Sequence, residues 1–358
     1  MLMVIFGAGA SYDSMPSHPA SPRTSAHHEE LRPPLASQLF ENRAQFAAAL
    51  KEFPDCHAII PWLRNPQGVT LEAALQQFQD GANSYPARYS QLAAVRYYLQ
   101  QMLYRCGEGW KHLAMGITNY KSLLDMVEEW RQSRDESVCL VTFNYDTLLE
   151  DALPSIGFTI NGIGDYVAAH PRYILVKLHG SVTWSREVDF PTDFRLQGGP
   201  QSVRQELIRR AAEVKVSNRY IHENPYTIGL HDGKVVFPAI AIPVETKSQF
   251  ECPDEHIDIL RSKLPKVRKV LIVGWRAAEQ HFLKLLSEHL CGPLEVVVVE
   301  GSNAGARTVE SQLQPIIGER VNGGIQSVSG GFTGFVVGRR AIPFLEAIPR
   351  PSRSIRLE

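Results

Sequence analysis

The sequence VIFGAGAS near the start of the chain places small residues where a protein could bind the phosphates of a nucleotide. The turn Gly7-Ala8-Gly9 directly follows an apolar run, and Ser11 adds a hydroxyl. Glycines at the end of a strand let the backbone turn tightly and approach a pyrophosphate, which the N–H groups of the next helix then face. Because Tyr12 stands where a full GxGxxG pattern has its third glycine, a tight turn without a ligand is the alternative interpretation.

Two further polar clusters stand directly after apolar runs. Asn144-Tyr145-Asp146 follows one of these runs and His179-Gly180 follows another. Open α/β sheets bind ligands at the carboxyl ends of parallel strands, so both clusters stand where such a ligand would lie. His179 can act as a base near neutral pH, and Gly180 permits a ligand to approach closely. The alternatives are a plain helix N-cap for Asp146 and a hydrogen-bonded core histidine for His179.

Two later apolar runs also end in small or polar residues. Gly274 ends the first, and Gly301-Ser302-Asn303 ends the second. Such strand ends line the adenosine half of dinucleotide sites, so we predict that Gly274, Ser302 and Asn303 contact the cofactor. Each could equally be an ordinary strand-to-helix connection.

The elements that must position these residues are strands buried on both faces. Near-continuous apolar character is typical of parallel strands, and helical patterns separate most of the runs. The fold class is therefore α/β, a Rossmann-like doubly wound parallel sheet. The expected strands are Leu2–Phe6, Val138–Phe143, Tyr173–Leu178, Val270–Val273 and Leu294–Val299.

A long helical interval separates the first two expected strands, and we interpret it as a large all-helical insertion. Its expected helices are a segment from Ser37 through Leu50, one that Thr70 opens, Tyr89–Tyr104 and Tyr120–Trp130. The predicted divisions are 1–36 (first strand, glycine turn and cofactor loop), 37–135 (insertion), 136–335 (rest of the Rossmann domain) and 336–358 (tail). Residues 14–34 are rich in proline and form a loop, residues 187–200 are irregular, and a helix spans Gln201–Val214.

The composition narrows the class of protein. The 358 residues are 44% hydrophobic and 21% charged, which is ordinary for a globular chain. The net charge is −1, so the composition gives no sign of the basic face that binding to nucleic acid or to an anionic membrane requires. The cysteines are scattered without a CxxC pair, so we expect no zinc, and we interpret His27-His28-Glu29-Glu30 as a solvated loop and not a metal site. Without a signal peptide or membrane span, we expect a cytoplasmic location.

Together the motifs resemble the sirtuin family. That family has a GAG-S turn, an Asn-x-Asp strand end, a His-Gly strand end and a late G-S/x-N end in this order along the chain. This chain has Gly7–Ser11, Asn144–Asp146, His179-Gly180, and Gly274 with Ser302-Asn303. It departs from the deacylases of the family because it lacks their zinc module and their GIPDFR loop. The FNYD and KLHGS forms are similar to those of bacterial sirtuin-like proteins of antiphage defence, which hydrolyse NAD.

The resemblance implies that NAD is the substrate and is cleaved between nicotinamide and ribose. It implies that Asn144 holds the ribose or the water, Asp146 contacts the carboxamide or stabilises positive charge, and His179 is a general base or a ribose ligand. A protein deacylase or ADP-ribosyltransferase and an inactive NAD-binding sensor are the alternatives. Because a freely active NAD hydrolase would kill its own cell, we expect a homo-oligomer and a separate regulatory partner. A nucleic-acid-translocating ATPase is the candidate partner from related systems.

Overall fold

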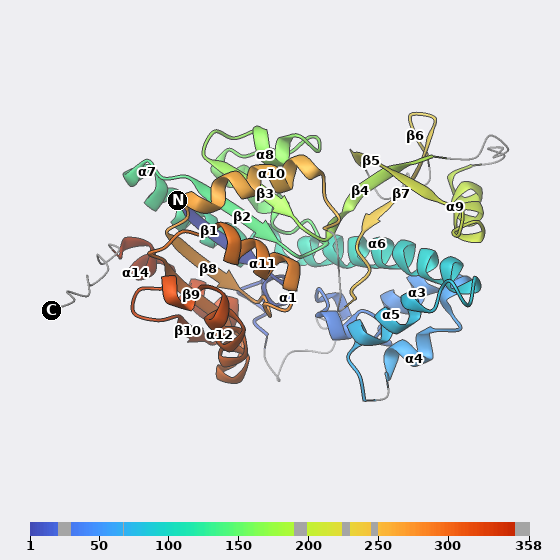
Figure 1. Cartoon of the computed structure of the whole chain (residues 1–358), viewed down its shortest axis with the longest axis horizontal. Helices are drawn as coiled ribbons and strands as arrows, with labels where there is room; N and C mark the ends of the chain where they lie inside the picture. The colour runs from blue at the N-terminus through green and yellow to red at the C-terminus, as the bar shows by residue number, and fades with distance from the viewer. Residues whose placement is uncertain (21–29, 67, 190–198, 224–229, 245–249, 348–358) are drawn as a thin grey trace.

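The computed structural model describes residues 1–20, 30–66, 68–189, 199–223, 230–244 and 250–347 (Figure 1). Its centre is a six-stranded parallel sheet in the order β10-β9-β8-β1-β2-β3. The strands are β1 (Leu2–Phe6), β2 (Val138–Thr142), β3 (Tyr173–Lys177), β8 (Lys269–Val273), β9 (Glu295–Glu300) and β10 (Gln326–Ser329). β1 is central, β2 and β3 follow on one side of it, and the chain then crosses to the other side to form β8, β9 and β10. This is the strand order of a Rossmann fold. The predicted fold class is confirmed.

The register of the sheet aligns the carboxyl ends of its strands. Phe6 of β1 pairs with Thr142 of β2 and with Val273 of β8. Thr142 in turn pairs with Lys177 of β3, and Val273 pairs with Val299 of β9. The polar residues that follow each strand therefore emerge along one edge of the sheet. The strand that the sequence did not predict, β10, is a short edge strand with partly exposed side chains and no apolar run.

Helices cover the sheet, and their apolar residues join one core with the strands. They are α1 (Ala8–Tyr12), α7 (Asn119–Arg134), α8 (Asp165–Ala168), α10 (Asp254–Lys263), α11 (Gln280–His289), α12 (Asn303–Ile317), α13 (Gly331–Val337) and α14 (Ala341–Glu346). Short 3₁₀ helices span Glu150–Ile156, Leu264–Lys266 and Gly318–Arg320. Asp146 does not cap a helix directly: its side chain accepts the backbone N–H of Leu148 in a turn, and the 3₁₀ helix that follows begins at Glu150.

A second unit lies beside the sheet, on the right in Figure 1, and has its own apolar core. Its helices are α3 (Ala44–Leu50), α4 (Ile60–Arg64), α5 (Leu71–Asp80), α6 (Ala87–Ala114) and α9 (Pro200–Arg209), with 3₁₀ turns at Ala36–Gln38 and Pro54–Cys56. They pack with an antiparallel sheet of β5 (Lys215–His222), β4 (Gly180–Asp189), β7 (Lys234–Ile240) and β6 (Leu230–His231), in that order. The sequence did not indicate this sheet.

Some helix ends in this unit differ from the prediction. The helix expected over Gln201–Val214 ends at Arg209, and the segment expected from Ser37 to Leu50 is broken, with α3 starting only at Ala44. Thr70 does open α5, where its hydroxyl accepts the N–H of Ala73 at 3.0 Å, as an N-cap residue should.

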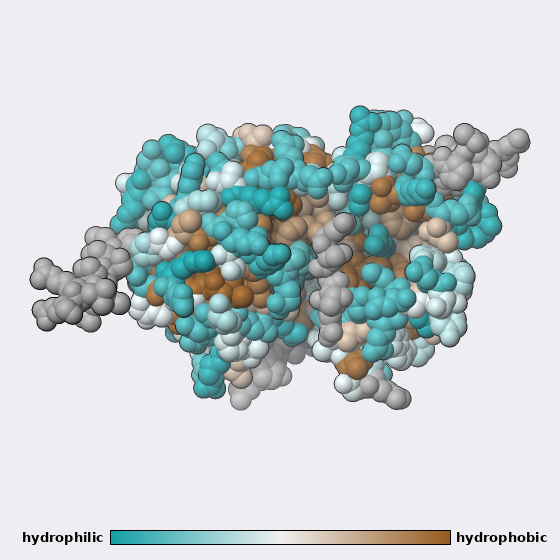
Figure 2. All heavy atoms as spheres, viewed as in Figure 1, coloured by the Kyte–Doolittle hydropathy of each residue, from teal (hydrophilic) through white to brown (hydrophobic). Residues whose placement is uncertain are grey.

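Helix α6 joins the two units. Residues from Leu92 to Cys106 pack in the second core, whereas Trp110 and Ala114 belong to the core of the parallel sheet. The Trp110 indole donates to the Ser14 hydroxyl at 2.9 Å, which ties the end of the helix to the segment after α1. Figure 2 shows a mostly hydrophilic face with apolar residues visible along the boundary of the two units.

Three features predicted from the sequence fall wholly or partly outside the described residues. They are the His27–Glu30 cluster, the irregular zone around 190–198 and the end of the tail from 348. Within the described ranges, no helix is long and apolar enough to cross a membrane. The same part of the chain contains no group of three or more His, Cys, Asp or Glu side chains able to hold a metal ion.

Candidate active site

A cavity of about 580 Å³ opens between the parallel sheet and the second unit. Its sheet side is formed by residues that follow β1, β2, β3 and β8 and by Glu300, the last residue of β9, all at the aligned strand ends. Its opposite side comes from the segment Pro33–Leu39, from Thr70 and Glu72 at the start of α5, and from Leu103 to Gly107 of α6. A volume of this size suits a ligand as large as a nucleotide.

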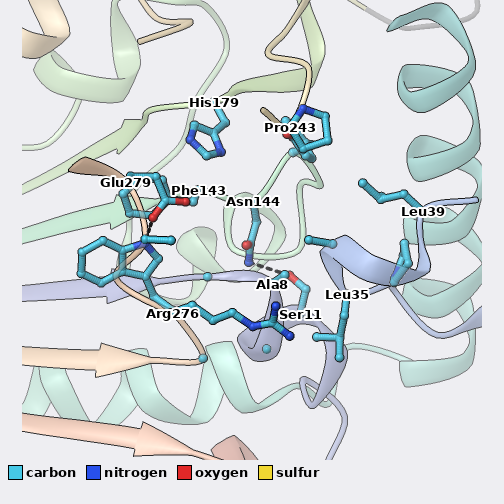
Figure 3. Close-up of a pocket in the computed structure, with 18 of the residues that line it drawn as sticks. Ala8, Ser11, Leu35, Leu39, Phe143, Asn144, His179, Pro243, Arg276 and Glu279 are labelled. Atoms are coloured by element: carbon cyan, nitrogen blue, oxygen red, sulfur yellow. Dashed lines mark hydrogen bonds between the residues drawn. The ribbon is translucent and has the colours of Figure 1, made fainter. Parts of the chain in front are cut away.

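Most of the predicted site residues line this one cavity. Those that do are Gly7, Ala8, Gly9, Ser11, Asn144, Asp146, His179 and Gly274. Figure 3 shows Asn144, Ser11 and His179 around it, together with residues that the sequence did not single out, such as Phe143, Arg276 and Glu279.

Three predicted cofactor residues are not among those that line the cavity. Ser302 caps α12, where its hydroxyl accepts the N–H of Gly305 at 3.1 Å, and Asn303 is exposed in the first turn. Gly180 has φ +80°, and a Cβ there would overlap the carbonyl oxygen of Ala239. That glycine permits β4 to lie close against β7. Contact of these three residues with a nucleotide remains a prediction.

The glycine turn packs backbone against backbone. The N–H of Gly7 donates to Val273 O and that of Gly9 donates to Gly274 O, each at 3.0 Å. A Cβ on Gly7 would lie 2.5 Å from Gly274 O, and one on Gly9 would lie 2.8 Å from Gly274 Cα. The absence of side chains therefore lets the ends of β1 and β8 touch, and their glycines form the floor of the cavity. The helix after this turn, α1, has only five residues.

Replacing Gly274 with alanine should destabilise the protein by about 2 to 4 kcal/mol, measured by denaturant unfolding. Gly274 has φ +61°, and a Cβ there would overlap the backbone of Gly9 and Ala10. Gly301→Ala is the matched control, because no atom lies within 4 Å of its added Cβ and it should change stability by less than about 0.5 kcal/mol. Equal stabilities of the two variants would contradict this account of the floor.

Asn144 is held in a buried triangle of polar side chains. Its Nδ2 donates to Ser11 Oγ at 2.9 Å and to Tyr120 Oη at 3.1 Å, and those two hydroxyls lie 3.0 Å apart. Burial, followed by the charge of Asp146, raises the pKa of Tyr120 well above its usual value, so the phenol stays protonated. Because both amide hydrogens are used, the carbonyl oxygen is the group that Asn144 can offer to a ligand. Tyr120 comes from α7, and no sequence signal marked it.

Asp146 and His179 are both buried at the wall of the cavity. The ammonium of Lys177 donates a hydrogen bond to the backbone carbonyl of Asp146 at 2.6 Å. The same ammonium forms an ion pair with the carboxylate of Glu150 at 2.7 Å. The His179 ring lies edge-on to Phe143 with ring centroids 5.0 Å apart, and it stacks on Tyr145 at 6.0 Å. Lys177, the last residue of β3, thus ties that strand to the turn after β2 that contains Asp146.

Four charged residues that the sequence did not single out also line the cavity: Glu72, Arg276, Glu279 and Glu300. Glu300 is the last residue of β9, and its Oε1 is buried with no hydrogen-bond partner among the described residues. Burial raises the pKa of Glu300, and the N–H of Gly301 and the charge of Arg276 oppose that rise. Arg276 is exposed and follows Gly274 by two residues. The strand end at 299–301 could have suggested Glu300, since an acidic residue at a strand end is a known ribose ligand in Rossmann sheets.

The chain matches no protein-family model and no curated protein. Its backbone is similar to that of solved Sir2 structures. A mutant Sir2 homologue in complex with 2′-O-acetyl-ADP-ribose is 13% identical, with 98% of this chain and 94% of that one covered and a TM-score of 0.39. Sir2Tm bound to a propionylated peptide is 10% identical, with 96% and 92% covered and a TM-score of 0.40. A Sir2 homologue mutant with ADP-ribose is 12% identical, with 97% and 94% covered and a TM-score of 0.37. These identities and TM-scores describe a similar path of the backbone. The function proposed below is argued from the residues that line the cavity.

Proposed function

We propose that the cavity binds NAD+ and that the chain hydrolyses the nicotinamide–ribose bond, giving nicotinamide and ADP-ribose. The observation that carries the proposal is that Asn144 and His179, from the ends of two neighbouring strands, line the same cavity as the glycine floor. The floor alone would support only dinucleotide binding. The second support is the sequence itself: the order of the motifs resembles that of the sirtuin family, and the FNYD and KLHGS forms resemble those of bacterial sirtuin-like NAD hydrolases.

The proposed reaction needs little chemistry from the protein. The bond between ribose C1′ and the nicotinamide nitrogen breaks, and its electron pair neutralises the pyridinium. Water then adds to C1′ and loses a proton, so NAD+ and water give nicotinamide, ADP-ribose and a proton. Catalysis requires an oriented dinucleotide, stabilisation of the positive charge that develops on the ribose, and a positioned water.

In this proposal each buried polar residue has a role near C1′. Asn144 holds the nicotinamide ribose or the water with its carbonyl oxygen. Asp146 contacts the carboxamide or stabilises the developing charge, and His179 takes the proton of the water or holds the ribose hydroxyls. Pro33, Pro34 and Leu35 line the cavity and would help to exclude bulk water.

One assay tests the proposal. The purified protein is incubated with NAD+ alone, and the products are separated by chromatography. Nicotinamide and ADP-ribose in equal amounts, without any acylated peptide, are expected. A requirement for an acylated peptide would identify a deacylase, and ADP-ribose attached to protein would identify a transferase. NAD+ that binds but survives would identify an inactive sensor, so each of these results would overturn the proposal.

Glu300 should make the protein prefer NAD+ over NADP+. Its carboxylate can accept the adenosine ribose hydroxyls, whereas the 2′-phosphate of NADP+ would add negative charge beside it. Glu300→Gln should lower kcat/KM for NAD+ by about tenfold and shift the preference towards NADP+. Because the ionised carboxyl is the better acceptor, KM for NAD+ should rise as the pH falls through the raised pKa of Glu300.

Steady-state kinetics against pH with both dinucleotides check this prediction. Glu300→Gln should remove the rise in KM at low pH, and Glu319→Gln, on an exposed 3₁₀ turn, should retain it. Unchanged discrimination in Glu300→Gln would place the ribose elsewhere.

We further propose that NAD+ depletion by this chain serves antiphage defence and that the activity is gated by a homo-oligomer or a separate partner. The basis is physiological, because an ungated NAD hydrolase would deplete its own cell. A nucleic-acid-translocating ATPase is the candidate partner. Mass photometry combined with the activity assay tests the gating, and a fully active monomer at cellular concentration would rule it out.

A further inference from the structure

Helix α6 contains a glycine that the helix itself does not require. Gly107 lies in the interior of this 28-residue helix. Glycine is less favourable than alanine in a helix interior, because it loses more conformational freedom on folding and packs no side chain. A helical backbone suits any L residue, so the conformation of Gly107 does not account for the glycine.

The packing around Gly107 does not account for the glycine either. Gly107 is buried, yet a Cβ on it would meet no atom of the described residues within 4 Å. The neighbouring glycine, Gly109, differs, because its Cβ would lie 3.2 Å from Leu31 Cδ2. A buried position with free space beside it borders a cavity, and Gly107 is among the residues that line the cavity described above.

Gly107 interrupts a row of side chains on one face of α6. The row consists of Leu103, Cys106, Gly107 and Trp110, whose spacing i, i+3, i+4 and i+7 places them on the same side of a helix. Leu103 packs in the second core, and Trp110 packs in the core of the parallel sheet. The Cys106 thiol donates to the backbone carbonyl of Leu31 at 3.0 Å. The gap in the row therefore falls where α6 passes from one core to the other.

Gly107 can offer a ligand only van der Waals contact. The N–H and C=O groups in the middle of a helix bond to each other, so none is left for a ligand. Without a Cβ, however, the helix backbone permits a closer approach than any other residue would. Figure 3 shows two apolar residues from the same side of the cavity, Leu35 and Leu39, opposite Phe143 and Glu279. A ligand between these walls would be in contact with both units.

We propose that the bound dinucleotide lies against the backbone of α6 at Gly107, and that this glycine limits the size of the group that fits there. Gly107 is then a specificity-determining residue that the second unit contributes to the site. The inference rests on the function proposed above. It explains why an unfavourable residue stands in the helix, and it predicts opposite effects of a side chain at 107 on stability and on binding.

Substitutions in the full chain test both effects. Gly107→Ala and Gly107→Leu should each raise the Tm of the ligand-free protein by about 2 °C, because alanine and leucine favour the helix and their side chains enter empty space. Calorimetric binding of carbocyclic NAD+, whose glycosidic bond is not cleaved, should be weaker. The Kd should rise about threefold in Gly107→Ala and at least about 30-fold in Gly107→Leu.

The matched controls are Gly334→Ala and Gly334→Leu. Gly334 lies inside α13 and outside the cavity lining, and a Cβ on it would also meet no atom within 4 Å. These variants should raise the Tm in the same way and leave the Kd within about twofold of wild type.

A Kd in Gly107→Leu within about twofold of wild type would overturn the proposal. A Tm of Gly107→Ala below that of wild type would also overturn it, because packing would then require the glycine. If the wild-type protein binds neither carbocyclic NAD+ nor ADP-ribose, the proposed function itself is wrong, so the two failures can be told apart.

Discussion

Asn144→Ala and His179→Ala should each abolish NAD+ cleavage, with kcat lower by about 10²- to 10³-fold or more. Asn144 is oriented by Ser11 and Tyr120, so its carbonyl oxygen needs no rearrangement to hold a ribose or a water. His179 is oriented by the rings of Phe143 and Tyr145. Such preorganised groups act mainly on the transition state, so the loss should fall on kcat. Nicotinamide released at saturating NAD+ is the measurement.

Two exposed residues provide controls of the same types. Asn65→Ala, at the end of α4, and His112→Ala, on α6, remove an amide and an imidazole away from the cavity and should keep the wild-type rate. ADP-ribose should still bind to His179→Ala, which separates loss of chemistry from loss of the site. A rate within about twofold of wild type in either site variant would exclude that residue from the reaction.

Lys177→Met should destabilise the protein by about 3 to 5 kcal/mol at neutral pH. The Lys177 ammonium is fully buried and holds both the carbonyl of Asp146 and the carboxylate of Glu150. Removing it leaves a buried carboxylate without its cation and frees the loop that carries Asn144. Burial already raises the pKa of Glu150, and Lys177 limits that rise.

The loss should depend on pH with a definite sign. Without Lys177, the folded-state pKa of Glu150 rises further above its unfolded value, so folding takes up a proton. Stability is then retained below the unfolded pKa and is lost as the pH rises through the folded one. The difference between Lys177→Met and wild type in guanidinium unfolding should therefore be larger at pH 8 than at pH 5.

Two comparisons make this prediction specific. Lys177→Met combined with Glu150→Gln should recover part of the lost stability, because the uncompensated charge is gone and the amide can still accept the Tyr166 hydroxyl that Glu150 accepts at 3.2 Å. Lys284→Met breaks an exposed ion pair with Glu288 and should change stability by less than about 1 kcal/mol. A loss in Lys177→Met no larger than that of Lys284→Met would show that the buried pair does not stabilise the fold.

The sequence by itself determined the parallel sheet and the edge at which the site lies. Strands buried on both faces must be apolar throughout, so runs such as Leu2–Phe6 and Val138–Phe143 could be located without any structure. Parallel strands in register then bring their carboxyl ends to one edge. For that reason Gly7, Asn144 and His179 could be expected at one cavity although they are far apart in the chain.

Only the tertiary structure decided which side chains at that edge face the cavity. Successive residues at a strand end point in different directions, so a shift of one or two positions exchanges Glu300, which lines the cavity, for Ser302, which caps a helix. Contacts between distant segments have no periodic signal either. The hydrogen bond of Tyr120 to Asn144, the pairing of Lys177 with Glu150 and the hydrogen bond from the Trp275 indole to Glu279 all depend on how separate elements pack. The apolar runs in the sequence thus predicted the sheet edge where the site lies. The packing of separate elements determined which side chains face the cavity, and with what charge and geometry.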